Sequence, residues 1–261
     1  MDVPTLAQSL LGLFSGSVVG FSLGLVGGGG SILAVPLLVY LVGVSSPHVA
    51  IGTSAVAVAA SALINLVAHS RAGHVRWRCA LVFAAAGMVG AIGGSTLGKA
   101  MDGKQLLALF AVLMIIVAGS MLRRRSNEGD RLVTLGRENV LHLIGFGFGA
   151  GALSGFFGIG GGFLIVPGLI MASRMPMLDA VGSSLVAVAA FGLATAANYA
   201  TSGLVDWRLS GMLIGGSLVG GLLGARAATL LSSRRGALEV AFSGMIIATA
   251  IYVLVRSFWS A

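Results

Sequence analysis

The chain has 261 residues, of which 57% are hydrophobic and only 9% are charged, and its mean hydropathy is +1.01. A soluble domain carries about 25% charged residues on its surface. The composition therefore excludes soluble enzymes and predicts an all-α polytopic membrane protein. The net charge of +8 does not indicate nucleic-acid binding, because basic residues of membrane proteins gather in cytoplasmic loops. One cysteine, Cys79, and four scattered histidines predict no disulfide, metal or cofactor.

Charge-free runs of about 20 residues predict membrane-spanning helices. The first apolar stretch has no Lys or Arg before it, so residues 8–26 are expected to be a retained membrane segment and not a cleavable signal peptide. Single spans are predicted at 49–68, 79–98 and 105–122. The second half repeats the pattern at 180–205, 209–225 and 240–255.

Two charge-free runs, 3–47 and 139–173, are too long to be single spans. As unbroken helices they would measure roughly 68 and 53 Å, against a hydrocarbon core of about 30 Å. Each is predicted to turn back at its glycines, at residues 27–30 in the first run and 158–162 in the second. These hairpins either span or re-enter, which leaves 6, 8 or 10 crossings in total.

The chain contains an internal repeat at an offset of 130 to 131 residues. The tripeptide Gly52-Thr53-Ser54 aligns with Gly182-Ser183-Ser184, and a later Gly-x-Val-x-Trp-Arg motif, at 73–78, aligns with the same motif at 203–208. We expect two homologous repeats, 1–122 and 138–261, joined by a basic connector at 123–137. Each repeat has a glycine-rich, broken-helix hairpin plus three spanning helices.

The distribution of Lys and Arg favours an inverted arrangement of the two repeats. An odd number of crossings per repeat turns the second repeat upside down and places 12 basic residues on one side and 4 on the other. A parallel arrangement divides them ten to six. The positive-inside rule favours the first division, and the connector 123–137 is cytoplasmic in both.

The sequence offers no catalytic residues. All eight acidic residues lie in predicted loops or near segment ends, and the glycines are followed by neither a nucleophile elbow nor a Walker lysine. No histidine occupies a corresponding place in both repeats, so Ser183 and Ser184 are not expected to be nucleophiles. His69 and His74 flank a basic loop, and we expect them to be solvated or interfacial.

The glycine hairpins are the candidate substrate site. Helices starting near Ser31 and Phe163 would present free backbone N–H groups and the positive end of a helix dipole, which bind anions without a buried cation. Hydroxyl and amide side chains in the following helices add hydrogen-bond donors. The candidate substrate-binding residues are Gly28, Gly29, Gly30, Ser31, Thr53, Ser54, Asn65, Gly160, Gly161, Gly162, Ser183, Ser184 and Asn198.

A purely structural interpretation of the same residues stays open. Glycines also allow helices to cross closely, and Ser or Thr hydroxyls often bond to a carbonyl one turn earlier. We expect the pairs Gly93-Gly94 and Gly220-Gly221 to serve packing, and Pro36 and Pro167 to kink their helices.

The duplicated pattern, glycines followed by Val-Pro, then Gly-[Thr/Ser]-Ser and Gly-x-Val-x-Trp-Arg, resembles the TauE/SafE family of sulfite and organosulfur-anion exporters. The resemblance runs from about Gly12 to Arg256. It implies a bacterial inner-membrane protein that moves a small, often sulfur-containing anion. The halves differ at Ser31, where the second half has Gly162, and at His48, near the place of Asp179; these differences can tune the substrate.

We therefore expect a secondary transporter for a small inorganic or organic anion, working by alternating access without ATP. The alternative is a non-transporting membrane scaffold or assembly component whose glycines pack helices. The expected partners are the anion and the lipid bilayer, with no nucleic acid, and a homodimer is one option for the assembly.

Overall fold

The computed structural model describes residues 6–123, 137–158, 162–232 and, beyond these, 240, 244, 247–249 and 251. Most of the predicted connector 123–137 and of the predicted span 240–255 lies outside the described residues. The helices are α1 (Leu6–Val26), α2 (Ala34–Pro36), α3 (Pro47–Arg71), α4 (Trp77–Lys99), α5 (Gly103–Arg123), α6 (Arg137–Phe157), α7 (Gly162–Ser173), α8 (Met177–Ala200) and α9 (Trp207–Ser232).

The predicted all-α membrane class is confirmed. Every regular element of the described ranges is helical, and six helical stretches are long and apolar enough to cross a bilayer. They are Gln8–Val42, Pro47–Arg71, Trp77–Lys99, Val140–Phe157, Met177–Ala200 and Trp207–Leu231.

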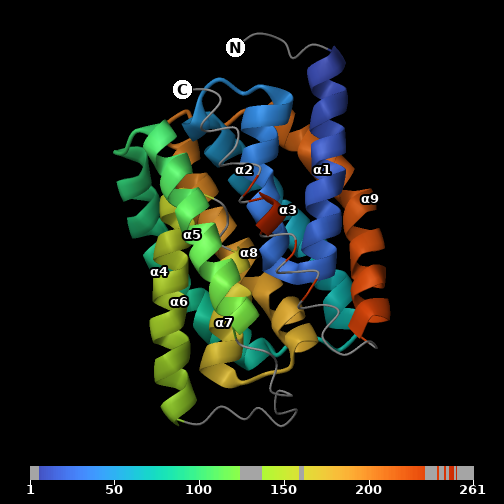
Figure 1. Ribbon diagram of the computed structural model, residues 1–261, viewed down its shortest axis with the longest axis vertical. Coiled ribbons are helices and arrows are strands. Elements are labelled where there is room, and N and C mark those ends of the chain that lie inside the picture. The colour runs from blue at the N-terminus through green and yellow to red at the C-terminus, as the bar shows by residue number, and fades with distance from the viewer. Residues whose placement is uncertain are drawn as a thin grey trace.

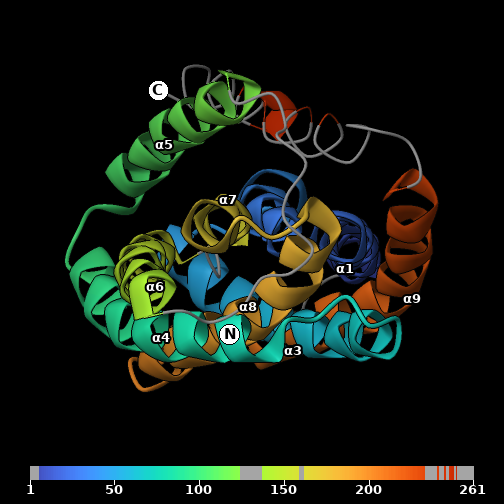
Figure 2. The ribbon, with the colours of Figure 1, turned by 90° about the horizontal axis from the view of Figure 1, so that it is seen from below.

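The helices α3 and α8 form the centre of the bundle. Figure 2 shows α8 in the middle, with α1 and α9 on one side and α4 and α6 on the other. The helix α1 packs along α9, α6 packs along α4, and α3 packs against α8. Thus the first long helix of each half lies against the third long helix of the other half.

The first hairpin reverses directly after α1. Gly27 has a φ of +62°, a left-handed conformation that glycine adopts without steric cost, and Gly30 then lies against the backbone of Ser22 and Leu23. The predicted helix start at Ser31 is wrong. A 3₁₀ helix already begins at the reversal (Gly27–Leu33), because residues without side chains tolerate its eclipsed turns, and a π-helical turn (Leu37–Val42) follows α2.

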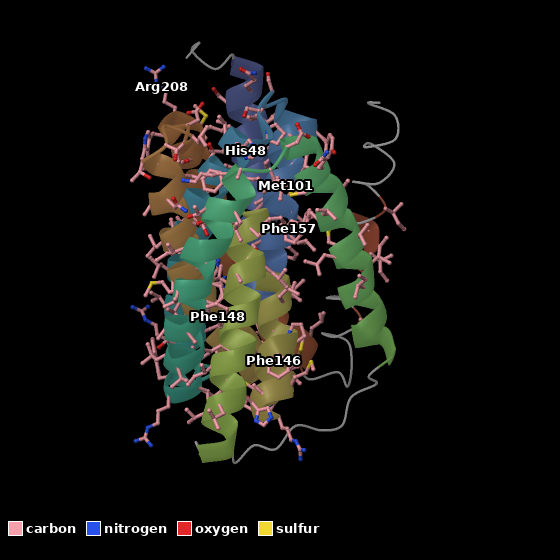
Figure 3. The ribbon with its side chains drawn as sticks, turned by 90° about the vertical axis from the view of Figure 1, so that its left-hand side faces the viewer. His48, Met101, Phe146, Phe148, Phe157 and Arg208 are labelled. Atoms are coloured by element: carbon pink, nitrogen blue, oxygen red, sulfur yellow. The ribbon has the colours of Figure 1, made fainter. Side chains whose placement is uncertain are left out.

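The second hairpin reverses at Gly158, which has a φ of +65°. Residues 159–161 lie outside the described part of the chain, and α7 begins at Gly162, beside the predicted start at Phe163. In Figure 1, α1 descends from the upper end of the molecule, whereas α6 rises from the lower end. The order of Phe146, Phe148 and Phe157 from bottom to top in Figure 3 shows the same rise of α6.

Rows of glycine account for the close contact of the outer helix pairs. At each of these positions a Cβ atom would overlap a backbone carbonyl of the facing helix. The rows are Gly16, Gly20 and Gly24 of α1 against Gly216, Gly220 and Gly224 of α9, and Gly90, Gly94 and Gly98 of α4 against Gly147, Gly151 and Gly155 of α6. The packing role expected for Gly94 and Gly220 is therefore confirmed. Gly93 faces open space, and Gly221 meets the side chain of Asn65.

The adjacent glycines of α4 provide a matched test. Gly94→Ala would push a methyl group into the backbone of Ala152 and should destabilise the fold by about 1–3 kcal/mol, the usual cost of overpacking. Gly93→Ala fills open space and should be neutral, or stabilising by up to about 1 kcal/mol through helix propensity. The unfolding temperature in detergent can be followed by dye labelling of the buried Cys79. Equal unfolding temperatures for the two variants would contradict this packing.

Candidate functional site

The tip of the first hairpin is bound to α8 at a contact that we call the lower junction, formed by Gly27, Gly28, Val181, Ser183 and Ser184. The backbone N–H of Gly28 donates a hydrogen bond to Ser184 Oγ (2.9 Å), and Ser184 Oγ–H donates to the carbonyl of Val181 (2.7 Å). Gly27 lies against Val181, and both serines are fully buried. The junction thus joins one predicted glycine site to the predicted hydroxyl pair of the other half.

The second hairpin meets α3 at the corresponding contact, the upper junction, formed by Gly158, Ile51, Thr53 and Ser54. Gly158 lies against the side chain of Ile51, and the fully buried Thr53 and Ser54 follow on α3. Gly160 and Gly161, two of the predicted site residues, lie outside the described residues. Gly162 is the first residue of α7.

The four predicted hydroxyls divide into two kinds. Ser54 donates to the carbonyl of Ile51 (2.9 Å), as Ser184 does to Val181, so the single proton of each is used by its own helix. Thr53 and Ser183 instead accept hydrogen bonds from the backbone N–H groups of Asp206 (2.9 Å) and Arg76 (2.8 Å). These acceptors tie each central helix to the segment just before α9 or α4.

The structure does not bring the two hairpin tips together. Gly27 contacts Val181, near the start of α8, whereas Gly52, beside Ile51, lies next to Tyr199 near the end of the same helix. Eighteen residues separate Val181 from Tyr199, which at about 1.5 Å per residue is about 27 Å. This distance nearly equals the hydrocarbon thickness of about 30 Å. The two junctions are therefore separate sites at opposite ends of the α3–α8 pair.

The remaining predicted site residues follow the same division. Asn65 lies between α1 and α9, where its Nδ2 donates to the Ser61 carbonyl (2.9 Å). Asn198 lies at the upper end, where its Oδ1 accepts from Lys99 Nζ (2.7 Å). Ser31 Oγ donates to the Gly28 carbonyl (2.9 Å), and Gly29 and Gly30 are buried in the 3₁₀ helix.

Charged residues from the loop before α4 and from the first turn of α8 lie at the lower junction. Arg76, whose backbone binds Ser183, also pairs through its guanidinium with Asp179 Oδ2 (2.8 Å). His74 Nδ1 lies 3.8 Å from Asp179 Oδ1. The signal for Arg76 was present in the sequence, since it lies within the first Gly-x-Val-x-Trp-Arg motif, but residue spacing alone did not connect it to the serines of α8.

The expectation of a solvated His69 is wrong. Its exposed fraction is 2%, because α3 continues to Arg71 and its last turns are covered by α1. His69 Nε2 lies 3.0 Å from the carbonyl oxygen of Gly24, three residues before the hairpin reversal. A protonatable side chain is therefore buried beside the lower junction.

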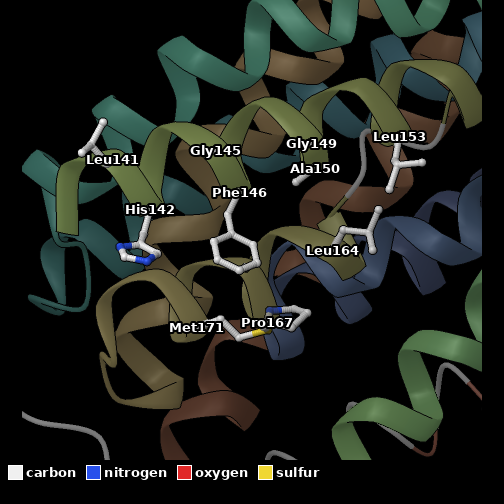
Figure 4. Close-up of a pocket in the computed structure, with 11 residues that line it drawn as sticks. Leu141, His142, Gly145, Phe146, Gly149, Ala150, Leu153, Leu164, Pro167 and Met171 are labelled. Carbon is white, nitrogen blue, oxygen red and sulfur yellow. The ribbon is translucent and has the colours of Figure 1, made fainter. Parts of the chain in front are cut away.

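A separate groove of about 630 Å³ lies between α6 and α7. Figure 4 shows Phe146, Leu164 and Met171 along it, with His142 at one end. Because its lining is mostly apolar, this groove is unsuited to a small hydrated anion. Within the described ranges no group of three or more His, Cys, Asp or Glu residues is placed to hold a metal ion.

The contact between Gly28 and Ser184 can be tested by comparing equivalent serines. Ser184→Ala would leave the buried Gly28 N–H without its acceptor and should destabilise the protein by about 1–3 kcal/mol. Ser54→Ala removes only a bond to its own helix, so we expect a change below about 0.5 kcal/mol. Thermal unfolding in detergent measures both. A Ser54 variant as unstable as the Ser184 variant would refute the special role of the lower junction.

Comparisons with known proteins identify a family for this chain. The family model described as "Sulfite exporter TauE/SafE" matches residues 12–253. A "Probable membrane transporter protein" of Xylella fastidiosa (strain 9a5c) is 50% identical over 258 residues, covering 98% of each chain. The "Probable membrane transporter protein YunE" of Bacillus subtilis is 27% identical over 240 residues, 83% of this chain and 85% of that protein. No solved structure matches significantly. The chain is thus a multi-pass membrane protein that belongs to the TauE/SafE sulfite exporter family, a family of membrane transporters.

Proposed function

We propose that the protein is a secondary transporter for a small anion, such as sulfite or a related sulfur-containing anion, and that it works by alternating access. The observation that carries the proposal is the buried contact of the Gly28 N–H with Ser184 Oγ, which joins a glycine hairpin to the hydroxyls of the other half. Each junction is then one half-site, and the anion passes from one to the other.

The chemistry of the lower junction suits an anion. An anionic oxygen is a stronger hydrogen-bond acceptor than a serine hydroxyl, so it can replace Ser184 as the acceptor of the Gly28 N–H. Ser183 accepts one bond from Arg76 and keeps its own proton to donate. The Arg76 guanidinium, held by Asp179, adds a positive charge nearby. At the upper junction Thr53 has the role of Ser183.

The proposal includes two inverted repeats, 1–122 and 138–261, in a bacterial inner membrane with the connector on the cytoplasmic side. The opposite directions of α1 and α6 support it (Figure 1). So do the hydrogen bonds Arg76–Ser183 and Asp206–Thr53, because Asp206 follows Arg76, and Ser183 follows Thr53, by the repeat offset of 130 residues. Inversion would relate the two junctions by symmetry, so that one opens to each side of the membrane.

The scaffold alternative rests on the glycine rows between α1 and α9 and between α4 and α6, which packing alone explains. Those rows do not explain the glycine tip at residues 27–30, which lies beyond the helix crossing. The two functions are separated by transport itself.

Transport can be measured as counterflow of labelled sulfite, methanesulfonate or sulfate in proteoliposomes. If Ser183 and Thr53 donate to the anion, Ser183→Ala and Thr53→Val should each cost about 1.5–3 kcal/mol, a loss of roughly 10- to 150-fold in apparent affinity. Ser173→Ala is the matched control, because the buried Ser173 hydroxyl bonds to the Leu169 carbonyl of its own helix. No counterflow of any of the three anions by well-folded protein would favour the scaffold.

Orientation of the repeats is tested by cysteine labelling in a Cys79→Ala background. The loop residues Ala72 and Thr201 occupy corresponding ends of the two halves, and inversion places them on opposite faces of the membrane. A membrane-impermeant maleimide should therefore label Ala72→Cys only from the cytoplasm and Thr201→Cys only from outside. Labelling of both from the same side would exclude inversion.

A further inference from the structure

A row of buried polar side chains follows one face of α3 toward the lower junction. Ser54, Ser61, Asn65 and His69 recur at intervals of seven, four and four residues, which keeps them on one side of the helix, and each is at most 2% exposed. The matching positions of α8, at the repeat offset of 130, are Ser184, Phe191, Thr195 and Tyr199. Phe191 interrupts the polar row there, so the uninterrupted row belongs to α3.

The hydrogen bond of His69 fixes which ring nitrogen can take up a proton. Nε2 lies 3.0 Å from the Gly24 carbonyl, which can only accept, so Nε2 carries a hydrogen. Nδ1 is buried and has no hydrogen-bond partner among the described residues. Histidine is the side chain that gains and loses a proton near neutral pH. Tyr199, at the matching position of α8, cannot take up a proton there.

A route for protons leads from the loop after α3 to this nitrogen. The His74 ring lies edge-on to the His69 ring, with centroids 6.4 Å apart, a separation that one water molecule can bridge. His74 is partly exposed to solvent, and its Nδ1 lies 3.8 Å from Asp179. Protons can therefore step from solvent to His74 and on to His69.

Few other charges act on His69, and the one on its own helix is Arg71, two residues later. The helix α1 and the 3₁₀ helix contain no titratable side chain, and α9, which packs beside them, contributes Arg226 near this end. From α8 comes Asp179, from the loop before α4 comes Arg76, and Cys79 follows on α4. An anion at the hairpin tip would be the strongest new charge beside the ring, because Gly24 lies less than one helical turn before Gly27.

We propose that His69 is the proton-coupling residue of this transporter, an inference that rests on the proposed anion transport. When an anion occupies the lower junction, Nδ1 takes a proton that entered through His74, and the imidazolium balances the negative charge in a site of low dielectric. When the anion leaves on the far side, Nδ1 releases the proton along the polar row of α3, past Asn65 and Ser61, so that the proton crosses the membrane with the anion. One proton is bound and released with each anion, and no covalent bond is made.

The test compares labelled-anion counterflow with proton movement during net anion uptake, which a pH-sensitive dye inside the proteoliposomes reports, because one-for-one counterflow moves no net protons. Methanesulfonate and sulfate serve as probes, because their charges do not change near neutral pH. His69→Gln keeps an N–H for the Gly24 carbonyl but cannot be protonated, so counterflow should persist while proton movement is lost. His48→Gln is the matched control. His48 Nε2 lies 3.1 Å from the Met101 carbonyl and its Nδ1 has no partner in the described residues, but it lies at the upper end (Figure 3).

Equal proton movement by wild type and His69→Gln, or anion flux without protons in the wild type, would overturn the proposal and leave the transport function standing. A second measurement does not require any variant to be active in transport. Nitrogen-15 NMR of histidine-labelled wild type should show one Nδ1, absent from the His69→Gln spectrum, that is protonated at higher pH when the anions are added. An unchanged signal between about pH 5 and 8, where histidine titrates, would also overturn it. A shift without counterflow would instead support the proton site and contradict transport.

Discussion

The close approach of helix backbones in lipid is the constraint on which this structure depends. Between helices in a bilayer the hydrophobic effect gives little attraction, so association relies on van der Waals contact and hydrogen bonds. The glycine rows of α1 with α9, and of α4 with α6, allow carbonyl oxygens to lie where side chains would otherwise be. Each row fixes the first helix of one half to the other half. The hairpin that follows, at Gly27 or Gly158, is thereby held against the opposite central helix.

Because the two halves contact each other in this way, a few buried hydroxyl groups serve two purposes. Ser183, Ser184 and Thr53 accept backbone N–H groups from the other half, so the same few hydroxyls both satisfy buried donors and hold the halves in register. On this matching frame the two ends carry different chemistry. The lower end has His69, His74 and Arg76, whereas the residues 130 positions later, Tyr199, Leu204 and Asp206, lie toward the upper end. Unequal ends suit the directional transport that we propose.

Much of the fold could be predicted from the sequence, because membrane thickness converts charge-free lengths into helices and two runs were too long not to turn. How far each hairpin reaches into the membrane could not be predicted. It depends on whether the arm before each glycine tip crosses the whole bilayer, and α1, with 21 residues, is about 31 Å long. The tips therefore reach opposite ends and do not share one site. The burial of His69 could not be predicted for a related reason, since its place near a basic loop gives no sign that α1 covers it.

The separation of the junctions has a mechanical consequence for the proposed cycle. Both junctions involve the same central pair, since α8 carries Val181 and Ser184 at one end and Tyr199 at the other, while α3 carries Ile51 at the upper end and His69 at the lower. The hairpins are anchored to outer helices by backbone contact, which tolerates little sliding. A small tilt of α3 and α8 relative to the outer helices would loosen the contact with one hairpin tip and tighten the contact with the other. The Gly28 bond to Ser184 lies about 24 Å from the upper end of α8. A tilt of a few degrees about the middle would therefore move each end by about half an ångström to one ångström. That movement is enough to break the hydrogen bond, whose donor and acceptor are already 2.9 Å apart. Alternation then follows from the rigidity of two helices, without a separate moving domain.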